Sequence, residues 1–287
     1  MSLDSLNNAR QVAEHAADAA ETVIAGYLRA GNWKIQYKVD DSPVTEADIE
    51  TEKAIRAVLA DEFSDAAFYG EETGRSSTLN VLLDEPLTPG EPSDTDALKN
   101  LWLVDPIDGT KSFIRNMPFF STQIALQQNG ELVVGVSNAP LYKERLVASA
   151  GYGAWLNNVQ VHCRNITSLN EVFLSTGNLT RLAQQPAAWS ALAEIITSVR
   201  RVRGYGDFCH YHQLCCGQTD LIIESDVNIL DIAALTVGVR EAGGVITDLC
   251  GRPVCLDTTS VLAASTPQLH ASVLTHFSGK FTDDLVG

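Results

Sequence analysis

Residues 102–110 read Trp-Leu-Val-Asp-Pro-Ile-Asp-Gly-Thr. An apolar strand leads here into Asp105 and Asp108, and a hydroxyl residue follows the glycine. Divalent cations such as Mg²⁺ bind carboxylate and carbonyl oxygens, so the two aspartates and the Ile107 carbonyl between them can face one ion. Gly109 allows a phosphate to approach the backbone closely, and a helix that starts after it would direct free N–H groups at that anion. Taken alone, however, an Asp-Gly pair is equally typical of a turn.

Three further stretches place carboxylates near the ends of predicted elements. The adjacent acids Glu71 and Glu72 follow a short apolar-aromatic run. Asp48 lies three residues after Thr45, as in a helix capping box, and Asp231 heads an apolar helix. Each has an ordinary structural interpretation: a solvated helix end, helix capping, and a favourable contact with the helix dipole, respectively. Only their occurrence together with the first stretch points to a single site.

The predicted elements alternate between helices and strands along the chain. Apolar residues at helical spacing predict helices over residues 12–28, 187–199 and 232–242, with further helices starting at 45 and 266. Short apolar runs predict strands at residues 101–104, 122–126, 132–136, 145–148, 220–224, 245–247 and 261–264. The acidic, proline-containing segment 75–100 is expected to be an exposed loop and not a domain boundary. This alternation predicts layered α/β packing.

The composition is that of a globular protein with a strongly negative charge. The 287 residues are 45% hydrophobic, and 36 acidic against 20 basic residues give a net charge of -16. Such a charge argues against binding to a nucleic acid polymer or an anionic membrane, whose phosphates would be repelled. No segment is apolar for the length that a bilayer requires, charged residues interrupt any secretory signal, and the six cysteines form no CxxC pair. We therefore expect a cytoplasmic protein.

Three of the stretches together resemble the signature of a known family. They are Gly-Glu-Glu at 70–72, Asp-Pro-Ile-Asp-Gly-Thr at 105–110 and Asp-Ile-Ala-Ala at 231–234, and they occur in the order that the inositol monophosphatase superfamily shows. The resemblance extends over residues 42–265, nearly the whole chain. It implies an α/β fold of the inositol-monophosphatase type, a layered αβαβα sandwich. It also implies an enzyme that removes phosphate from a small phosphorylated metabolite.

The same resemblance implies how the chain is organised and what it requires. Residues 1–150 would form an N-terminal half with most of the metal ligands. Residues 151–287 would form a C-terminal half that supplies Asp231 and a substrate wall. The cofactor would be Mg²⁺, with two and up to three ions in each site. A homodimer and inhibition by Li⁺ are also expected.

By this resemblance, five residues would bind the metal ions. Glu71, Asp105 and the carbonyl of Ile107 would bind one Mg²⁺. Asp105, Asp108 and Asp231 would bind a second, and Glu71 would share a weaker third. Two neighbouring metal ions can activate a water and stabilise the leaving oxygen in an in-line displacement.

The resemblance also assigns residues to the attacking water and to the phosphate. Thr110, oriented by Asp48, would help Glu71 to position the water. The backbone N–H groups of Gly109 and Thr110 would hold the phosphate and stabilise the charge that develops on its oxygens. No covalent phosphoenzyme is needed.

Within the superfamily, the chain looks most like the histidinol-phosphate phosphatase branch. This closer resemblance depends on residues 42–48, residues 105–113 and the pair Gly206-Asp207. In place of Lys111-Ser112, inositol monophosphatases more often carry Thr-Asn. The closer resemblance therefore favours one substrate class within a shared phosphatase chemistry.

Two carboxylates would make the distal part of the pocket acidic. Glu224 stands seven residues before Asp231, as a substrate-contacting glutamate does in the family, and Asp207 starts a predicted helix. Histidinol phosphate carries an amine and an imidazole, both attracted to carboxylates, and is the expected substrate. Asp207 could instead only cap its helix. The alternatives for the chain are an inositol monophosphatase, a 3′-phosphonucleotide phosphatase or, in another class, a member that binds metal and ligand without turnover.

A separate group of potential zinc ligands lies at residues 209–216. On a helix, Cys209, His212 and Cys216 share one face, and these residue types bind zinc. Their spacing matches no ordinary zinc site, and cysteine is also a common core residue. We therefore favour a structural role for this group.

Overall fold

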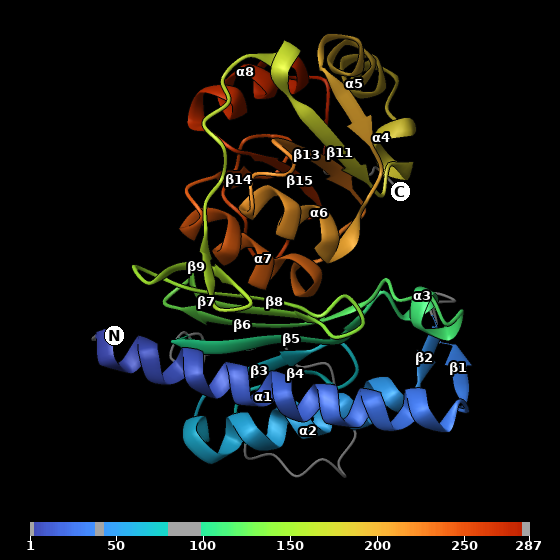
Figure 1. The fold of residues 1–287 in the computed structure, drawn as a ribbon, viewed down its shortest axis with the longest axis vertical. Coiled ribbons are helices and arrows are strands. Elements are labelled where there is room, and N and C mark those ends of the chain that lie inside the picture. Colours follow the sequence, from blue (N-terminus) through green and yellow to red (C-terminus); the bar gives the residue numbers. More distant parts are fainter. Residues whose placement is uncertain (1–2, 38–42, 80–98, 283–287) are drawn as a thin grey trace.

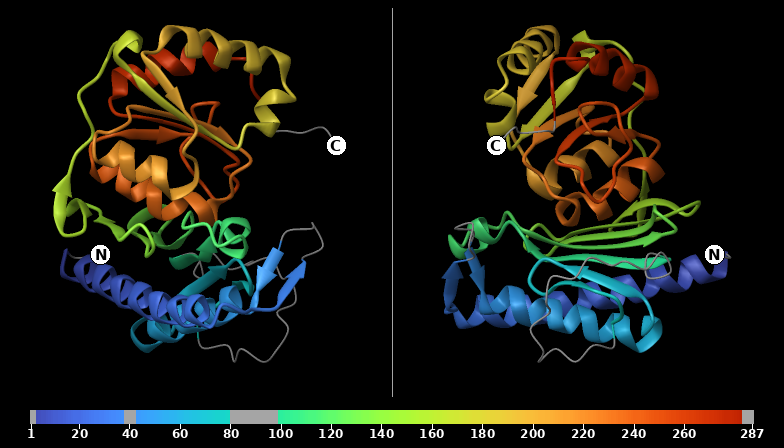
Figure 2. Two further views of the ribbon diagram at one scale, coloured as in Figure 1. Left: turned by 45° about the vertical axis from the view of Figure 1, so that its right-hand side comes forward. Right: turned by 180° about the vertical axis from the view of Figure 1, so that it is seen from behind.

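The computed structural model describes residues 3–37, 43–79 and 99–282, which fold into five layers (Figures 1 and 2). Helices form one outer layer, and an eight-stranded sheet lies against them. Two further helices fill the middle, a five-stranded sheet follows, and more helices cover its far face. The layered αβαβα arrangement predicted from the resemblance is confirmed.

The first outer layer consists of α1 (Leu3–Ala30) and α2 (Glu46–Phe63). The buried stripe of α1 is mostly alanine, and these small side chains allow α1 to pack closely on α2 and the sheet. α2 starts as predicted, because Thr45 Oγ1 accepts a hydrogen bond from the Ala47 N–H at 3.1 Å and Asp48 Oδ2 accepts one from the Thr45 N–H at 2.7 Å. This capping box also holds Asp48 in one orientation.

The eight-stranded sheet has the strand order β10-β9-β8-β7-β6-β5-β3-β4, with β3 parallel to β5 and all other neighbours antiparallel. Its strands are β3 (Ala67–Gly70), β4 (Gly74–Ser76), β5 (Asn100–Asp108), β6 (Ser121–Gln128), β7 (Glu131–Ala139), β8 (Glu144–Ser149), β9 (Gly153–Leu156) and β10 (Val159–Val161). A separate antiparallel pair and a short helix complete this part: β1 (Ile35–Tyr37), β2 (Pro43–Thr45) and α3 (Thr110–Ile114). The four strands predicted between residues 101 and 148 are confirmed, and each is longer than predicted.

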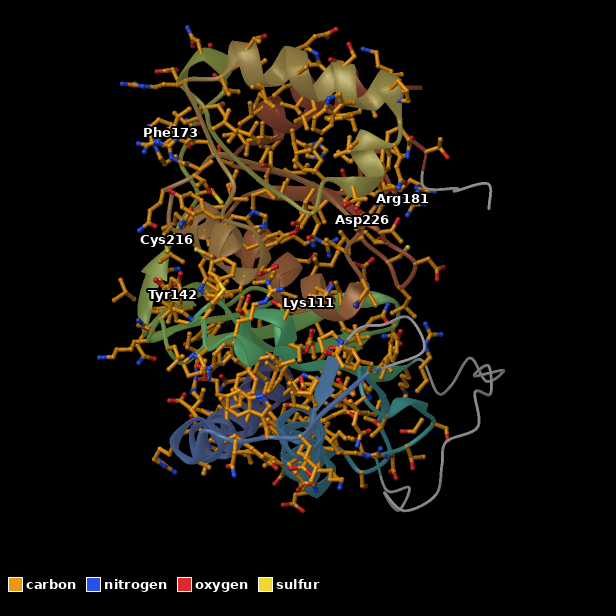
Figure 3. All side chains as sticks on the ribbon, turned by 90° about the vertical axis from the view of Figure 1, so that its right-hand side faces the viewer. Lys111, Tyr142, Phe173, Arg181, Cys216 and Asp226 are labelled. Atoms are coloured by element: carbon orange, nitrogen blue, oxygen red, sulfur yellow. The ribbon has the colours of Figure 1, made fainter. Side chains whose placement is uncertain are left out.

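The five-stranded sheet has the order β12-β11-β13-β15-β14, in which β11 is parallel to both its neighbours. Its strands are β11 (Phe173–Gly177), β12 (Arg201–Arg203), β13 (Leu221–Ser225), β14 (Val245–Thr247) and β15 (Ser260–Ala264). The helical elements outside it are η1 (Leu169–Glu171), α4 (Thr180–Ala183), α5 (Pro186–Ser198) and α8 (Pro267–Phe277). At the end of β13, Asp226 accepts a hydrogen bond from the Arg181 N–H at 2.9 Å, which ties this strand to α4 (Figure 3).

The middle layer consists of α6 (Asp207–Cys215) and α7 (Ile229–Glu241). α7 starts three residues earlier than predicted, because Asn228 caps it. Nearly all of its side chains are buried, as expected for a helix that is apolar on all sides. One apolar core joins α7 to strands of both sheets. Because both halves contribute to this core, the division into residues 1–150 and 151–287 stays a proposal.

The predicted acidic loop is described only at its ends. Arg75 belongs to β4, which pairs with β3, and Asn100 belongs to β5. The loop is therefore shorter than predicted at both ends. Residues 80–98, with all the prolines and acids that suggested it, lie outside the described residues. Among the described helices, none combines the length and the apolar character needed to cross a bilayer.

We expect Gly135→Ala to destabilise the protein. A Cβ on Gly135 of β7 would lie 2.3 Å from the carbonyl oxygen of Ala234 in α7, so the helix and the sheet would have to separate. Overpacking of this kind typically costs about 1–3 kcal/mol. The free energy of unfolding, measured by urea denaturation, should fall by that amount.

Gly26→Ala in α1 is the matched control. A Cβ at Gly26 would meet no atom within 4 Å, and the residue lies inside a helix. This change should stabilise the protein by about 0.5–1 kcal/mol. Equal stabilities of the two variants would show that the contact between β7 and α7 is looser than described.

Candidate metal centre and active site

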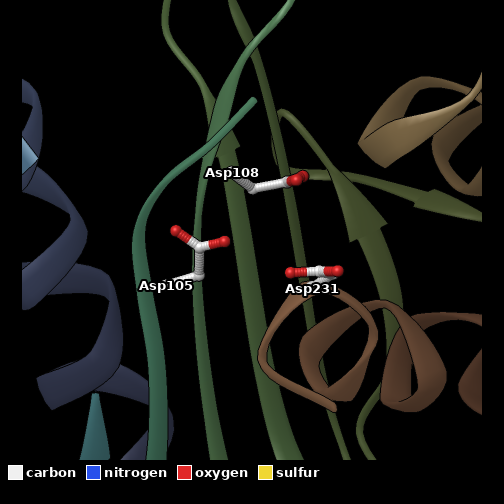
Figure 4. A group of neighbouring side chains, drawn as sticks. All are labelled: Asp105, Asp108 and Asp231. Atoms are coloured by element: carbon white, nitrogen blue, oxygen red, sulfur yellow. The ribbon is translucent and has the colours of Figure 1, made fainter. Parts of the chain in front are cut away.

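Three aspartates from two distant parts of the chain meet between the large sheet and the middle layer (Figure 4). Asp105 and Asp108 lie near the end of β5, and Asp231 lies in the first turn of α7. Their carboxylate oxygens lie within 4.8 Å of one another. Asp105 and Asp108 are buried, whereas Asp231 is partly exposed. The fold thus brings together three of the predicted metal ligands.

The end of β5 is irregular, and this irregularity allows both of its aspartates to face the same point. In a regular strand, residues three apart would point to opposite faces of the sheet. The pairing of β5 with β6 shifts its register between Asp105 and Asp108. Within this segment, Asp105 Oδ1 accepts a hydrogen bond from the Ile107 N–H at 3.0 Å. The local turn therefore orients Asp105.

Asp108 is held by two side chains of β6 that sequence reasoning missed. Ser121 Oγ donates to Asp108 Oδ2 at 3.1 Å, and it accepts a hydrogen bond from Gln123 Nε2 at 2.8 Å. Both residues are buried. The available signal was the pair of polar residues at alternate positions at the start of β6, before its apolar run at residues 124–126.

Asp231 serves both its helix and the cluster. Its Oδ2 accepts a hydrogen bond from the Asn228 N–H at 3.0 Å, which forms a capping box with the Asn228 side chain. The structural interpretation of Asp231 as a favourable acid in the first turn is therefore correct. The same side chain nevertheless belongs to the aspartate cluster, so the two interpretations are compatible.

Glu71 comes directly after β3, the strand that pairs with β5. Its backbone N–H donates to the carbonyl oxygen of Val104 at 3.1 Å. The turn after it is held by Glu52 of α2, whose carboxylate accepts hydrogen bonds from the Glu72 N–H at 2.8 Å and the Thr73 N–H at 3.0 Å. Glu52 is a third residue that sequence reasoning missed, and an acid on the buried side of a helix was the available signal.

The acids of this cluster raise one another's pKa values. Burial, followed by the charge of Glu71, raises the pKa of Asp105 well above its usual range. Burial, followed by the charge of Asp207, does the same for Asp108. Burial in this acidic environment raises the pKa of Asp231 to about 7. Within the described chain, none of the three aspartates forms an ion pair with a lysine or an arginine, so their charges are uncompensated.

Gly109 and Thr110 connect β5 to α3 beside the cluster. Thr110 Oγ1 lies 3.0 Å from Asp48 Oδ1 and 3.0 Å from the carbonyl oxygen of Ile107, which brings the predicted pair together. Gly109 has a φ of 95°, and a Cβ there would lie 2.8 Å from the carbonyl oxygen of Phe119. Only glycine fits this turn. The first N–H groups of a helix have no partner inside it and are available to an anion.

A small cavity of about 50 Å³ adjoins the cluster. It is lined by Asp108, Asn178, Asp207, Tyr211, Glu224, Val227, Asp231, Ile232 and Leu235. The predicted substrate-contacting acids, Asp207 and Glu224, therefore share one cavity with two of the aspartates. Gly206 is the N-cap of α6 and no side chain caps this helix, so the alternative in which Asp207 is only a cap is wrong. Burial, followed by the charge of Glu224, raises the pKa of Asp207 to about 6.

Comparison with known proteins identifies the family. The model of the inositol monophosphatase family matches residues 5–280. The chain belongs to the inositol monophosphatase family. Members of this family are phosphatases that act on phosphomonoesters, and this chain is accordingly a phosphatase.

Relatives within the family carry different functional names. A histidinol-phosphatase of Mycobacterium tuberculosis is 33% identical over 266 residues, which cover 91% of this chain and 95% of that protein. The Nus factor SuhB of Pasteurella multocida is 30% identical over 287 residues, which cover 97% and 99%. An inositol monophosphatase structure from Zymomonas mobilis superposes with a TM-score of 0.77 at 29% identity and covers 94% of this chain and 98% of that one. These relatives share one family, and their names differ in the function that they give.

The donor set of this family member fits a hard divalent cation. The inositol monophosphatase family is metal-dependent, and the three aspartates offer only oxygen ligands. Burial and the neighbouring acids raise the pKa values of these carboxyl groups, so their ionised forms carry unfavourable negative charge. A bound cation would offset that charge.

The alternative zinc group is not formed. His212 Nδ1 lies 3.0 Å from Glu144 Oε2, and its Nε2 lies 2.9 Å from Ser137 Oγ, so both ring nitrogens are engaged. In the part of the chain that the structure describes, the three aspartates are the only group of potential metal ligands whose ligand atoms lie within 4.8 Å of one another. Cys209, His212 and Cys216 therefore do not gather their ligand atoms for a zinc ion.

We expect Mg²⁺ to stabilise the protein in a pH-dependent way. Carboxyl groups with raised pKa values in the folded state favour folding at low pH, and this contribution is lost as the pH rises through about 7, the pKa of Asp231. Metal binds only the ionised carboxylates. The rise in unfolding temperature on adding Mg²⁺, followed by circular dichroism, should be small at about pH 5 and large at about pH 8.

Asp231→Asn should reduce the Mg²⁺-induced stabilisation at the higher pH, because it removes one of the charged oxygen ligands. It should also raise the unfolding temperature of the metal-free protein at that pH, because it removes one of the charges that repel each other. A Mg²⁺ effect of equal size at both pH values would show that the cluster is not the metal site.

Proposed function

We propose that this chain is a Mg²⁺-dependent histidinol-phosphate phosphatase. One observation carries the choice of substrate: the carboxylates of Asp207 and Glu224 lie in the cavity that adjoins the aspartate cluster. Histidinol phosphate carries an amine and an imidazole, so its end remote from the phosphate is attracted to two acids. The relatives named histidinol-phosphatases, from three bacteria, support the same choice.

The proposed metal ligands are those that the family resemblance assigns. Glu71, Asp105 and the carbonyl of Ile107 would hold one Mg²⁺. Asp105, Asp108 and Asp231 would hold a second, and Glu71 would share a third. Bound Mg²⁺ supplies Lewis-acid chemistry, which activates water and offsets the negative charge of the phosphate.

Thr110, Asp48 and Glu71 would orient the attacking water. The Thr110 hydroxyl directs its proton toward Asp48 Oδ1 and the Ile107 carbonyl, both at 3.0 Å. The lone pairs of Thr110 Oγ1 then remain available to accept a hydrogen bond from a water. Glu71, which follows the neighbouring strand β3, would accept a hydrogen bond from the second O–H of that water and fix its direction of attack.

The turn after β5 would hold the phosphate. The N–H groups of Gly109 and Thr110 lie at the start of α3, where no helical carbonyl is available to them. A phosphate there would receive hydrogen bonds aimed at the oxygens on which charge develops. The left-handed conformation of Gly109 makes this approach possible.

The distal acids would select the cation of the substrate. A charge-assisted hydrogen bond in a site that excludes water is stronger than a neutral one. A polyol phosphate, the substrate of the main alternative, offers hydroxyl groups and gains less from two carboxylates. The remaining parts of the proposal, which are Li⁺ inhibition, a homodimer and a cytoplasmic location, come from the family resemblance.

Activity should require the metal and the residue proposed to bridge two metal positions. Phosphate release should vanish with excess chelator and return with Mg²⁺. Asp105→Asn keeps the shape of the side chain and removes its charge, so kcat should fall by roughly two or more orders of magnitude while the unfolding temperature is retained.

Asp61→Asn is the control for Asp105→Asn. Asp61 is an exposed aspartate of α2, far along the chain from the cluster, and the same change there should leave kcat as it was. Full activity in chelator would contradict the proposed chemistry. Equal losses in the two variants would contradict the metal assignment.

The substrate is tested with a panel of phosphomonoesters compared by kcat/KM. Histidinol phosphate should exceed inositol monophosphate and 3′-phosphonucleotides. Asp207→Asn or Glu224→Gln removes one charge at nearly constant volume, and each should lower kcat/KM for histidinol phosphate about ten- to a hundredfold. An aryl phosphate whose organic group carries no positive charge cannot use these acids and should be hydrolysed as before.

Two results would overturn the choice of substrate and leave the phosphatase chemistry in place. One is a higher kcat/KM of the unmodified enzyme for inositol monophosphate. The other is unchanged turnover of histidinol phosphate by both amide variants. A stable, metal-binding protein that hydrolyses none of the esters would instead favour the alternative of a member without turnover.

A further inference from the structure

Glu224 is contacted by two consecutive side chains of α6. It projects from β13 and is 2% exposed. The hydroxyl of Tyr211 donates a hydrogen bond to its Oε1. The same oxygen lies 3.4 Å from Nε2 of His210, a side chain that is completely buried. One carboxylate oxygen of Glu224 thus faces two potential donors, neither of which has a role in the mechanism above.

The surroundings of His210 determine that Nε2 carries a hydrogen. Its Nδ1 lies 3.2 Å from Ser175 Oγ, which also accepts a hydrogen bond from the Tyr205 N–H at 3.3 Å. The Ser175 hydroxyl proton is therefore available to Nδ1. An unprotonated Nε2 would direct its lone pair at a carboxylate oxygen, which is repulsive. An N–H at Nε2 turns the same contact into an attraction.

Nε2 of His210 is close to Glu224 without a complete hydrogen bond. Among the described residues it has no hydrogen-bond partner, because the contact to Glu224 at 3.4 Å is long and poorly aligned. A buried N–H without a partner is costly. A small movement of the Glu224 carboxylate toward His210 would complete the bond, and hydrogen bonds of this kind commonly shorten when a ligand binds.

The second oxygen of Glu224 is left for a ligand. Glu224 lies opposite Gly177 in the parallel register of β13 and β11, and a Cβ on Gly177 would lie 2.5 Å from Oε2. Gly177 therefore makes room for this oxygen. Within the described chain no hydrogen bond reaches Oε2. Glu224 also lines the cavity together with Asp207 and Asp231.

The donors that hold Glu224 also preserve its charge. Burial, followed by the charge of Glu224, raises the pKa of Tyr211, so this hydroxyl stays neutral and protonated. The residues that line the cavity include no lysine or arginine. A neutral donor can orient a carboxylate without cancelling its charge, whereas a guanidinium in the same place would form an ion pair and remove the attraction for a cationic ligand.

We propose that His210 and Tyr211 are positioning residues that hold Glu224 by Oε1 and present Oε2 to the cationic nitrogen of the substrate. This inference rests on the proposed function, because it deepens the role of Glu224 in selecting a cationic phosphomonoester. It also explains the run of His and Cys residues at 209–212. His210 and Tyr211 serve the substrate wall, and His212 serves a separate contact with Glu144.

The test compares KM and kcat for histidinol phosphate and for p-nitrophenyl phosphate. Tyr211→Phe and His210→Met each remove one donor at similar volume. Each should raise KM for histidinol phosphate about tenfold, with kcat changed by less than about twofold. Turnover of p-nitrophenyl phosphate should stay as it was. His210→Gln, whose amide N–H can occupy the place of Nε2–H, should restore most of the lost affinity.

A double-mutant comparison with Glu224→Gln identifies the residue through which these donors act. In the Glu224→Gln background, adding Tyr211→Phe or His210→Met should change KM by less than about twofold, because the carboxylate that they orient is gone. Gln213→Leu is the control on the same helix, since Gln213 contacts Cys209 and not Glu224. It should leave both substrates unaffected.

The outcomes separate this inference from the proposed function. If Glu224→Gln leaves the preference for histidinol phosphate unchanged, Glu224 does not select the substrate as the proposed function requires. The positioning role of His210 and Tyr211 is then also overturned. If Glu224→Gln lowers the preference while Tyr211→Phe and His210→Met act equally on both substrates, or act additively with Glu224→Gln, only the positioning role is overturned. Unfolding temperatures accompany each variant. Should His210→Met not fold, Tyr211→Phe and its combination with Glu224→Gln decide the question.

Discussion

The close approach of three uncompensated carboxylates is the constraint on which the rest of this structure depends. Asp105, Asp108 and Asp231 repel one another in a site that water reaches poorly, and their raised pKa values express that cost. The elements that carry them must therefore be held together by contacts elsewhere. The extensive apolar core around α7 and the large sheet does this. A divalent cation converts the same repulsion into binding energy, which couples metal binding to the stability of the fold.

Each acid of the site is oriented by a donor that leaves part of the carboxylate available. The Ile107 N–H, the Ser121 hydroxyl and the Asn228 N–H hold Asp105, Asp108 and Asp231. The Tyr211 hydroxyl holds Glu224 in the same way. Neutral donors fix direction and preserve charge, so the site is prepared for a cation before one arrives. The aspartate cluster and the proposed substrate wall thus share the same kind of neutral donor, although they are built on different sheets.

The proposed reaction centre and the proposed substrate wall of this phosphatase lie in different layers. The aspartates and the turn at Gly109, which we propose to carry the reaction, come from β5 and the adjoining layers. Asp207 and Glu224 come from α6 and β13, in the second half of the chain. Relatives with different functional names can thus keep one reaction centre and vary the opposite wall.

The sequence by itself determined the features that depend on neighbouring residues: the helix and strand periodicities, the capping box at Thr45 and the Asp-Gly turn before α3. Family resemblance added the ligands and the layered fold. Only the tertiary structure decided which acids share a site, because a register shift in β5 brings Asp108 to the side of Asp105. It also revealed Ser121 and His210 and excluded the zinc group. Such contacts join residues far apart in the chain, and no local pattern encodes which faces of two elements will meet.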